Sequence, residues 1–307
     1  MSPDRRALFH PGSRAIRRLV PCLLLAALLG PAGRAGAEEE KRPAPGGWHA
    51  LLVGCTEYPV LRERLGKEKY DAARIALVGP ANDVVLMRRT LLEVFGVAPD
   101  RIKALAGWPE EAAQRPTHDN IIGELDRLAK AVKRGDRVLI HMAGHGSQAP
   151  DTSGDELDAL DEIFLPADVA GWDRQAGKVA GSITDDVLGA KVRAIRDAGA
   201  MVWLLMDCCH SGTMVRGGGQ GLRMRRLDPE YLGVPPTTTR GAGAEEDEPL
   251  PERELGDDQN LGAIVAMYAA QSYKLAPEMP LPRSGPREET RPHGLFTYMV
   301  VSQLRRS

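Results

Sequence analysis

The stretch 201–212 constrains the fold more than any other part of the chain, and it reads Met-Val-Trp-Leu-Leu-Met-Asp-Cys-Cys-His-Ser-Gly. Its first six residues are all apolar, which favours a strand buried on both faces, as in a parallel sheet covered by helices. The apolar run stops at Asp207, and the thiols of Cys208 and Cys209 follow. Reactive groups in open parallel sheets lie just beyond the carboxyl ends of strands, so a thiol here is a candidate nucleophile.

A second predicted strand, 136–143, is followed by a histidine instead of a cysteine, in Gly144-His145-Gly146. A thiol nucleophile needs a base because the thiolate is the attacking species. Neighbouring strands lie about 4.8 Å apart, so two adjacent strand ends would bring His145 and Cys209 into one cleft. The alternatives are an inert buried thiol and a histidine that only stabilises its turn.

Strand and helix patterns alternate along the rest of the chain. Apolar runs predict strands at 48–54, 101–105 and 263–269, and apolar residues at helical spacing predict helices at 82–95, 117–135, 184–199 and 295–304. Thr117 and Thr184 are expected to cap the second and third of these helices. This alternation predicts an α/β fold with a mostly parallel central sheet and right-handed crossovers.

The segment at the start of the chain reads as an export signal. Residues 1–37 contain a basic leader, a short apolar run at 19–29 and the small residues Ala35-Gly36-Ala37. The competing interpretation is an uncleaved membrane anchor, although the run is short for a membrane span. We expect cleavage near Ala37, a periplasmic or secreted protein and no membrane attachment afterwards.

Two further segments have the composition of linkers. Residues 38–47 are charged and then rich in Pro and Gly, and residues 217–262 combine Gly, Pro and charge with little hydrophobicity. We predict a linker at 38–47, a domain at 48–307 and a flexible insert at 217–262 within it.

The composition narrows the function classes. A net charge of −2 and 5% aromatic residues argue against a nucleic-acid-binding protein. Removal of the signal leaves Cys55, Cys208 and Cys209, and this odd number argues against a scaffold held by disulfides.

Three motifs, taken in order, resemble a known family. They are Gly144-His145-Gly146, the acidic loop 154–162 and Asp207-Cys208-Cys209-His210-Ser211-Gly212, and they look like the metacaspase branch of the caspase-like cysteine peptidases. The resemblance implies a caspase-like three-layer sandwich and a cysteine endopeptidase.

The same resemblance implies the roles of the reactive residues. Cys209 is the expected nucleophile, because the family motif places it immediately before His-Ser-Gly; Cys208 is the alternative. His145 is the expected acid and base. The backbone N–H groups of Cys209 and Gly146 are candidates for an oxyanion hole.

The family cleaves after basic residues, which implies protein or peptide substrates with Arg or Lys at the cleavage site. Asp207, two residues before the nucleophile, can pair with such a side chain. Asp83 matches the second acidic residue of the family's pocket. The alternative for Asp83 is a carboxylate that satisfies N–H groups at the start of its helix.

The resemblance also implies Ca²⁺ binding through Asp161, Asp185 and Asp186, and it implies no organic cofactor. Hard cations want several oxygen ligands, which an acidic loop supplies. The alternatives are a solvated acidic loop and, for Asp185 and Asp186, favourable charge at the start of a helix.

Basic residues in the predicted insert suggest self-processing. An enzyme that cuts after basic residues has targets at Arg223, Arg225, Arg226 and Arg240; the alternative is an ordinary linker. Two other functions compete with peptidase activity, namely an inactive caspase-like module that binds basic peptides and a calcium-binding structural domain.

Overall fold

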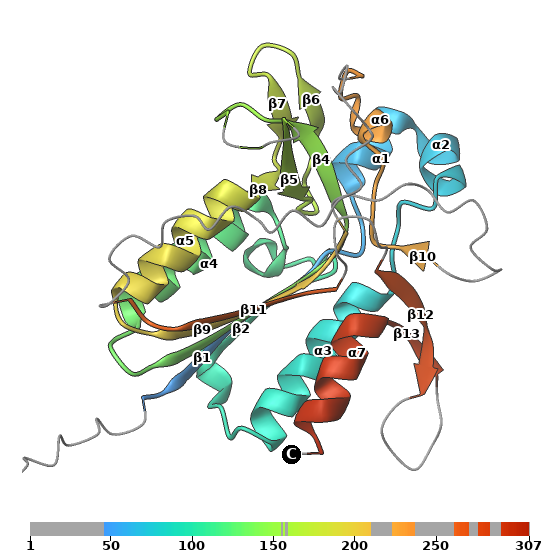
Figure 1. Ribbon diagram of the computed structural model, residues 1–307. Coiled ribbons are helices and arrows are strands. Elements are labelled where there is room, and N and C mark those ends of the chain that lie inside the picture. The colour runs from blue at the N-terminus through green and yellow to red at the C-terminus, as the bar shows by residue number, and fades with distance from the viewer. Residues whose placement is uncertain are drawn as a thin grey trace, which may run out of the picture. The chain divides into compact units, whose positions relative to one another are not determined.

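A five-stranded parallel sheet forms the centre of the computed structural model (Figure 1). The structure describes residues 46–154, 156, 159–209, 223–236, 261–269, 276–282 and 290–306, all within one compact unit, Pro43–Ser307. The strand order is β11-β9-β3-β1-β2, with bounds β1 Trp48–Gly54, β2 Ile102–Ala106, β3 Arg137–Ala143, β9 Met201–Asp207 and β11 Ile264–Tyr268. Every neighbouring pair in this sheet is parallel.

Helices cover both faces of the sheet (Figure 1). Helices α3 (Gly79–Glu93) and α7 (Leu295–Leu304) lie on one face, and α4 (His118–Ala131) and α5 (Asp185–Asp197) lie on the other. Successive residues of β1 alternate between them: Leu51 packs with the core under α4 and α5, and Leu52 packs with α3 and α7. The predicted three-layer α/β fold is confirmed.

Local sequence signals explain where two of these helices begin. The Thr117 hydroxyl accepts a hydrogen bond from the Asn120 N–H at 3.4 Å, and the Thr184 hydroxyl accepts one from the Val187 N–H at 3.2 Å. Both threonines therefore cap their helices as predicted. The predicted helix at 82–95 is displaced, because α3 begins at Gly79, with proline in its first turn, and ends at Glu93.

The two strands that precede the candidate reactive residues are neighbours. β3 and β9 pair along their whole length, with Ala143 opposite Asp207 at their carboxyl ends. His145 and Cys209 therefore leave the sheet at the same edge, as expected.

Shorter elements surround this edge. They comprise two small sheets, β4-β5-β8 and β6-β7, a third sheet, β10-β12-β13, and the helices α1, α2 and α6. Their bounds are β4 Gly146–Pro150, β5 Leu160–Phe164, β6 Gly171–Asp173, β7 Lys178–Ala180, β8 Ile183–Thr184, β10 Arg223–Met224, β12 Pro277–Pro282, β13 Thr290–Gly294, α1 Pro59–Leu65, α2 Lys67–Ala72 and α6 Pro229–Leu232. Two 3₁₀ turns, Pro99–Arg101 and Ala112–Gln114, complete the described elements.

The prediction of a flexible insert at 217–262 is wrong for residues 223–236. These residues form β10 and α6, and they contribute Arg225, Leu227 and Leu232 to the interior. A polar composition concealed this burial because the charge of Arg225 is balanced by side chains from distant parts of the chain. The remainder of the insert, at 217–222 and 237–260, lies outside the described residues.

The export signal at 1–37 also lies outside the described residues, as does the linker up to residue 45, so both stay predictions. Within the part of the chain that the structure describes, no helix has the length and apolarity needed to cross a bilayer.

Candidate active site

One carbonyl oxygen lies between the two candidate reactive residues. The Arg225 oxygen accepts the Cys209 N–H at 3.0 Å and the Gly146 N–H, from the residue after His145, at 3.1 Å. Two N–H donors that converge on one oxygen are the arrangement an oxyanion hole needs. The backbones of Cys209 and of the residue after His145 therefore meet at a single peptide group, and the side chains of Cys209 and His145 are almost completely buried.

The orientation of the His145 ring defines which nitrogen can accept a proton. Its Nε2 lies 2.8 Å from the Ile75 carbonyl oxygen. A carbonyl only accepts hydrogen bonds, so Nε2 carries the hydrogen and Nδ1 keeps its lone pair. Nδ1 has no hydrogen-bond partner among the described residues. Burial lowers the pKa of His145 to about 4, so the imidazole is neutral at neutral pH.

Cys209 is not ionised in this arrangement. Its Sγ accepts the Ala276 N–H, and burial nevertheless raises the pKa of the thiol to about 11. The pair therefore consists of a protonated thiol and a neutral imidazole. The neighbouring Cys208 is buried as well.

The Arg225 side chain fills a pocket made by three carboxylates, which we call the arginine pocket: Asp83, Asp207 and Glu278. Arg225 Nη1 lies 2.9 Å from an Asp207 oxygen, while Nη2 bonds to Asp83 and lies 3.6 Å from a Glu278 oxygen. Arg225 is completely buried, as are Asp83 and Asp207. The structure thus brings together the two acidic residues predicted to recognise a basic side chain.

Glu278 and His293 belong to this site, but sequence reasoning missed them. Glu278 also accepts the Val78 N–H at 3.0 Å, and His293 Nδ1 lies 2.9 Å from an Asp83 oxygen. They come from β12 and β13, whereas Asp83 lies on α3. About 200 residues separate Val78 from Glu278, so no local motif marks the contact. The only sequence signal for Glu278 is its position as a single acidic residue in a proline-rich stretch.

Asp83 serves the pocket rather than its own helix. It accepts the Gly294 N–H at 3.2 Å in addition to its bonds with Arg225 and His293, and the start of α3 has no side-chain cap. Burial alone would raise the pKa of Asp83, but the Arg225 guanidinium and the hydrogen bond to His293 hold it below its usual value. Burial alone would likewise lower the pKa of Arg225, but Asp207 and Asp83 raise it above its usual value.

Asp207 is anchored from the opposite side by helix α7. Its Oδ2 accepts the Thr297 N–H at 3.1 Å and the Thr297 hydroxyl, whose oxygen lies 2.8 Å from His141 Nε2. The first turn of α7 thus fixes the carboxylate that faces Arg225 Nη1.

Two glycines allow the guanidinium to enter the arginine pocket. A Cβ added at Gly79 would lie 2.7 Å from Arg225 Nη2, and one at Gly294 would collide with the Asp207 carboxylate and Arg225 Nη1. Both positions need the close approach that only glycine permits.

The chain around Arg225 lies across the site as an extended segment. On one side, β10 pairs antiparallel with β12, and the Arg225 N–H donates to the Ala276 carbonyl at 3.1 Å. On the other side, the Leu227 N–H donates to the Gly146 carbonyl at 3.0 Å. Residues 223–227, which we call the bound segment, therefore have the main-chain contacts of a docked peptide.

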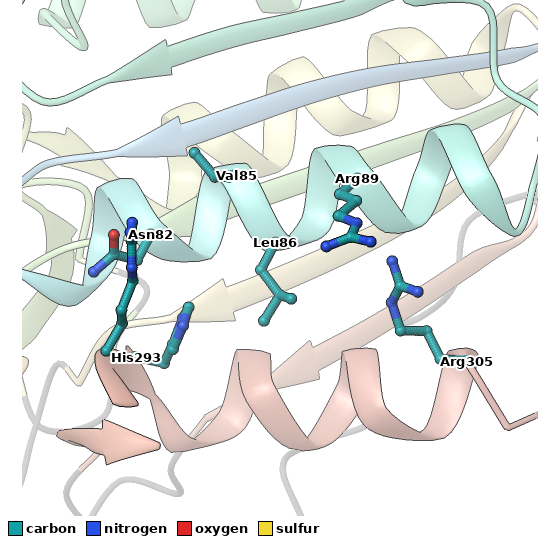
Figure 2. Close-up of a pocket in the computed structure, with 7 residues that line it drawn as sticks. Asn82, Val85, Leu86, Arg89, His293 and Arg305 are labelled. Carbon is teal, nitrogen blue, oxygen red and sulfur yellow. The ribbon is translucent and has the colours of Figure 1, made fainter. Parts of the chain in front are cut away.

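A separate pocket opens between α3 and α7 (Figure 2). Its lining includes Asn82, Leu86, Arg89, His293 and Arg305. The guanidinium groups of Arg89 and Arg305 point toward one another across it, and both bond to Glu93, at 2.7 and 2.6 Å. This pocket contains neither Cys209 nor His145, so it is not the reactive site.

The predicted calcium ligands influence one another electrostatically. Asp161 is mostly buried, and this burial, together with Asp151, Asp185 and Asp186, raises its pKa to about 6. Asp185 and Asp186 occupy the first turn of α5, as the alternative interpretation expected. Among the described residues, no three acidic, histidine or cysteine side chains are arranged to hold a metal ion. Calcium binding stays a prediction.

The first prediction concerns the charge of Arg225. Arg225→Ala leaves three buried carboxylates without their cation, and we expect it to lower the free energy of unfolding by about 3–5 kcal/mol. The adjacent Arg226→Ala removes only the partly exposed pair with Asp228 and should cost less than about 1 kcal/mol. Urea unfolding of both variants measures the difference, and equal losses would contradict a structural role for the arginine pocket.

The second prediction concerns His145 and pH. Its pKa falls from 6.5 to about 4 on folding, so its contribution to stability is complete above pH 6.5 and is lost as the pH falls toward 4. Between pH 7 and pH 5 the protein should lose about 2 kcal/mol of unfolding free energy through this group. His49 and His141 also have lowered pKa values, so the test is the difference between two proteins. Urea unfolding at both pH values should show a loss about 2 kcal/mol larger in the wild type than in His145→Asn. Parallel profiles would refute the buried neutral state.

Comparison with known proteins identifies the family of this chain. A family model described as "Metacaspase, peptidase C14 domain" matches residues 49–216. Metacaspase-1 of Yarrowia lipolytica is 34% identical over 164 residues, which are 53% of this chain and 31% of that protein. Metacaspase-1A of Aspergillus fumigatus is 34% identical over 177 residues, or 55% and 39% of the two chains. The chain thus spans about a third of the length of these curated relatives.

A solved structure supports the fold. A protein from Geobacter sulfurreducens superposes with a TM-score of 0.51 at 22% identity, covering 85% of this chain and 82% of its own. The family model covers more than half of the chain and includes the strand ends that carry His145 and Cys209. The chain therefore belongs to the metacaspase family, peptidase C14.

Proposed function

We propose that the chain is a cysteine endopeptidase that cleaves proteins and peptides after arginine and lysine, and that its own Arg225–Arg226 bond is a substrate. One observation carries the proposal: Arg225 has its guanidinium between Asp83 and Asp207 and its carbonyl oxygen on the N–H groups of Gly146 and Cys209. A carbonyl polarised by two donors beside a thiol is positioned for nucleophilic attack.

The proposed reaction uses the two predicted residues in turn. Cys209 Sγ attacks the Arg225 carbonyl carbon while its proton passes to His145 Nδ1, the nitrogen that carries the lone pair. The negative charge that develops on the oxygen is stabilised by the Gly146 and Cys209 N–H groups. His145 then protonates the Arg226 nitrogen as the peptide bond breaks, and water hydrolyses the remaining thioester.

The bound segment would also make the intact chain latent. While Arg225 fills the arginine pocket, no other basic side chain can enter it, and the thiol remains protonated with its pKa near 11. Proteolysis of other proteins would therefore require the bound segment to leave. Calcium is a proposed activator that takes no part in the steps of the reaction.

The arginine pocket favours arginine over lysine. Each terminal nitrogen of the guanidinium meets a different carboxylate, Nη1 with Asp207 and Nη2 with Asp83 and Glu278. A lysine ammonium is a single point charge and cannot span the carboxylates in this way. Lysine would still be accepted because the pocket carries excess negative charge.

The alternative function is a catalytically inactive module that holds basic peptides. Complete burial of Arg225 without any reaction would suit such a module equally well. The competing functions therefore differ in whether the Arg225–Arg226 bond is cut.

The third prediction tests self-processing. Purified wild-type chain should yield two fragments separated at Arg225–Arg226, and Cys209→Ala should stay intact because it lacks the nucleophile. Arg225→Ala should lose this cut while Arg226→Ala keeps it, since only Arg225 occupies the arginine pocket. Intact-protein mass spectrometry identifies the fragments; a wild-type chain that stays as whole as Cys209→Ala would support the binding module instead.

The fourth prediction tests the role of Glu278. Once the bound segment has been cleaved and has left the arginine pocket, the protein should hydrolyse an arginine-terminated reporter peptide with a higher kcat/KM than its lysine counterpart. Glu278→Gln should reduce this ratio by about tenfold, because a buried negative charge 3.6 Å from Nη2 is lost. The exposed Glu63→Gln is the matched control. An unchanged ratio in Glu278→Gln would remove Glu278 from the specificity site.

A further inference from the structure

Gly146 holds the chain on both sides of the bond that we propose to be cut. Its N–H donates to the Arg225 carbonyl at 3.1 Å, and its own carbonyl accepts the Leu227 N–H at 3.0 Å. These two hydrogen bonds enclose Arg226 as a single β-bridge. One residue thus fixes the register of the acyl half and the amine half of the Arg225–Arg226 peptide bond.

The amine half is anchored independently of that bond. The Ser147 hydroxyl donates to the Leu227 carbonyl at 2.7 Å, and the side chains of Leu227 and Leu232 are buried in the main core. The Arg64 guanidinium donates to the Tyr231 carbonyl. All of these contacts involve atoms on the amine side, so cleavage at Arg225–Arg226 removes none of them.

The acyl half is anchored as well. Arg225 keeps its three carboxylates, and β10 keeps its pairing with β12. The new amine of Arg226 would therefore remain beside the Cys209 thioester instead of diffusing away, as the leaving peptide of an ordinary substrate does.

We propose that the same site reseals the Arg225–Arg226 bond, so that Cys209 and His145 catalyse peptide-bond formation on this segment as well as hydrolysis; the inference rests on the proposed peptidase function. In the resealing step the Arg226 amine attacks the thioester carbon, its proton passes to His145, and the C–S bond breaks. The Cys209 thiolate then recovers the proton from His145. No additional reactant is needed, because the thioester supplies the activated carbonyl.

The competition between water and the held Arg226 amine determines whether the Cys209 thioester is hydrolysed or resealed. Groups fixed in reactive geometry behave as though present at about 10⁵ M or more, far above any solution concentration. The held amine therefore captures most thioesters before water does. The bound segment consequently behaves as a slow, self-restoring inhibitor, and net cleavage requires the amine half to undock.

The same chemistry runs from the hydrolysed form. Cys209 attacks the Arg225 carboxyl group and one of its oxygens leaves as water, after which the Arg226 amine closes the bond. In water labelled with oxygen-18, this cycle places the heavy isotope in the Arg225 carbonyl of intact chains. Hydrolysis alone labels only the cleaved chains.

The experiment follows full-length protein in water labelled with oxygen-18 and measures both intact and cleaved peptides around residue 225 by mass spectrometry. We expect label in the intact wild-type peptide. Leu232→Ala, which loosens the amine half, should accelerate net cleavage by about tenfold or more and reduce that label. Ser147→Ala, which removes only the bond to Leu227, is a milder second variant and should shift both readouts in the same direction.

Leu128→Ala is the matched control, because it removes an equally buried leucine from α4, away from the bound segment, and it should leave the cleavage rate unchanged. Labelled cleaved chains beside unlabelled intact wild-type chains, with Leu232→Ala and Ser147→Ala no faster than wild type, would overturn resealing while leaving the peptidase intact. Absence of any cleavage in every variant would instead refute the proposed function.

Discussion

The burial of one guanidinium among three carboxylates is the interaction on which this end of the molecule depends. Removing a charge from water costs several kcal/mol even after relaxation, so neither Arg225 nor the carboxylates could be buried alone. Together they join α3, β9 and β12 to the bound segment. The arginine pocket is therefore ordered by the residue that occupies it, and a vacant pocket would be a less stable structure.

The same occupancy sets the state of the reactive pair. Arg225 brings its carbonyl to the N–H groups of Gly146 and Cys209, and its presence helps to exclude solvent from both side chains. In that dry environment the thiol keeps its proton and the imidazole remains neutral, so both reactive groups are uncharged. Occupancy of the pocket by Arg225 thus both positions the carbonyl and keeps the thiol from ionising.

Local patterns predicted much of this arrangement. The apolar runs that end at Ala143 and Asp207 identified two neighbouring strands, and the residues just beyond them, His145 and Cys209, do lie at one peptide group. The composition of residues 223–236 wrongly predicted a flexible insert. Charged residues usually indicate solvent exposure, and the partners of Arg225 lie far away in the sequence. β12 was missed for another reason: Pro277, Pro280 and Pro282 argue against a strand, yet β12 pairs with strands on both sides.

The glycines at 79 and 294 show that the specificity of the arginine pocket for a long cation depends partly on the absence of side chains at these two positions. A single methyl group at either position would collide with the guanidinium and with one of its carboxylates, Glu278 at position 79 and Asp207 at position 294, without touching the thiol or the imidazole. One added carbon at position 79 or 294 would be enough for a related protein to recognise a different substrate side chain. Alanine at position 294 in an otherwise similar chain would therefore indicate a changed substrate specificity in a protein that keeps its catalytic residues.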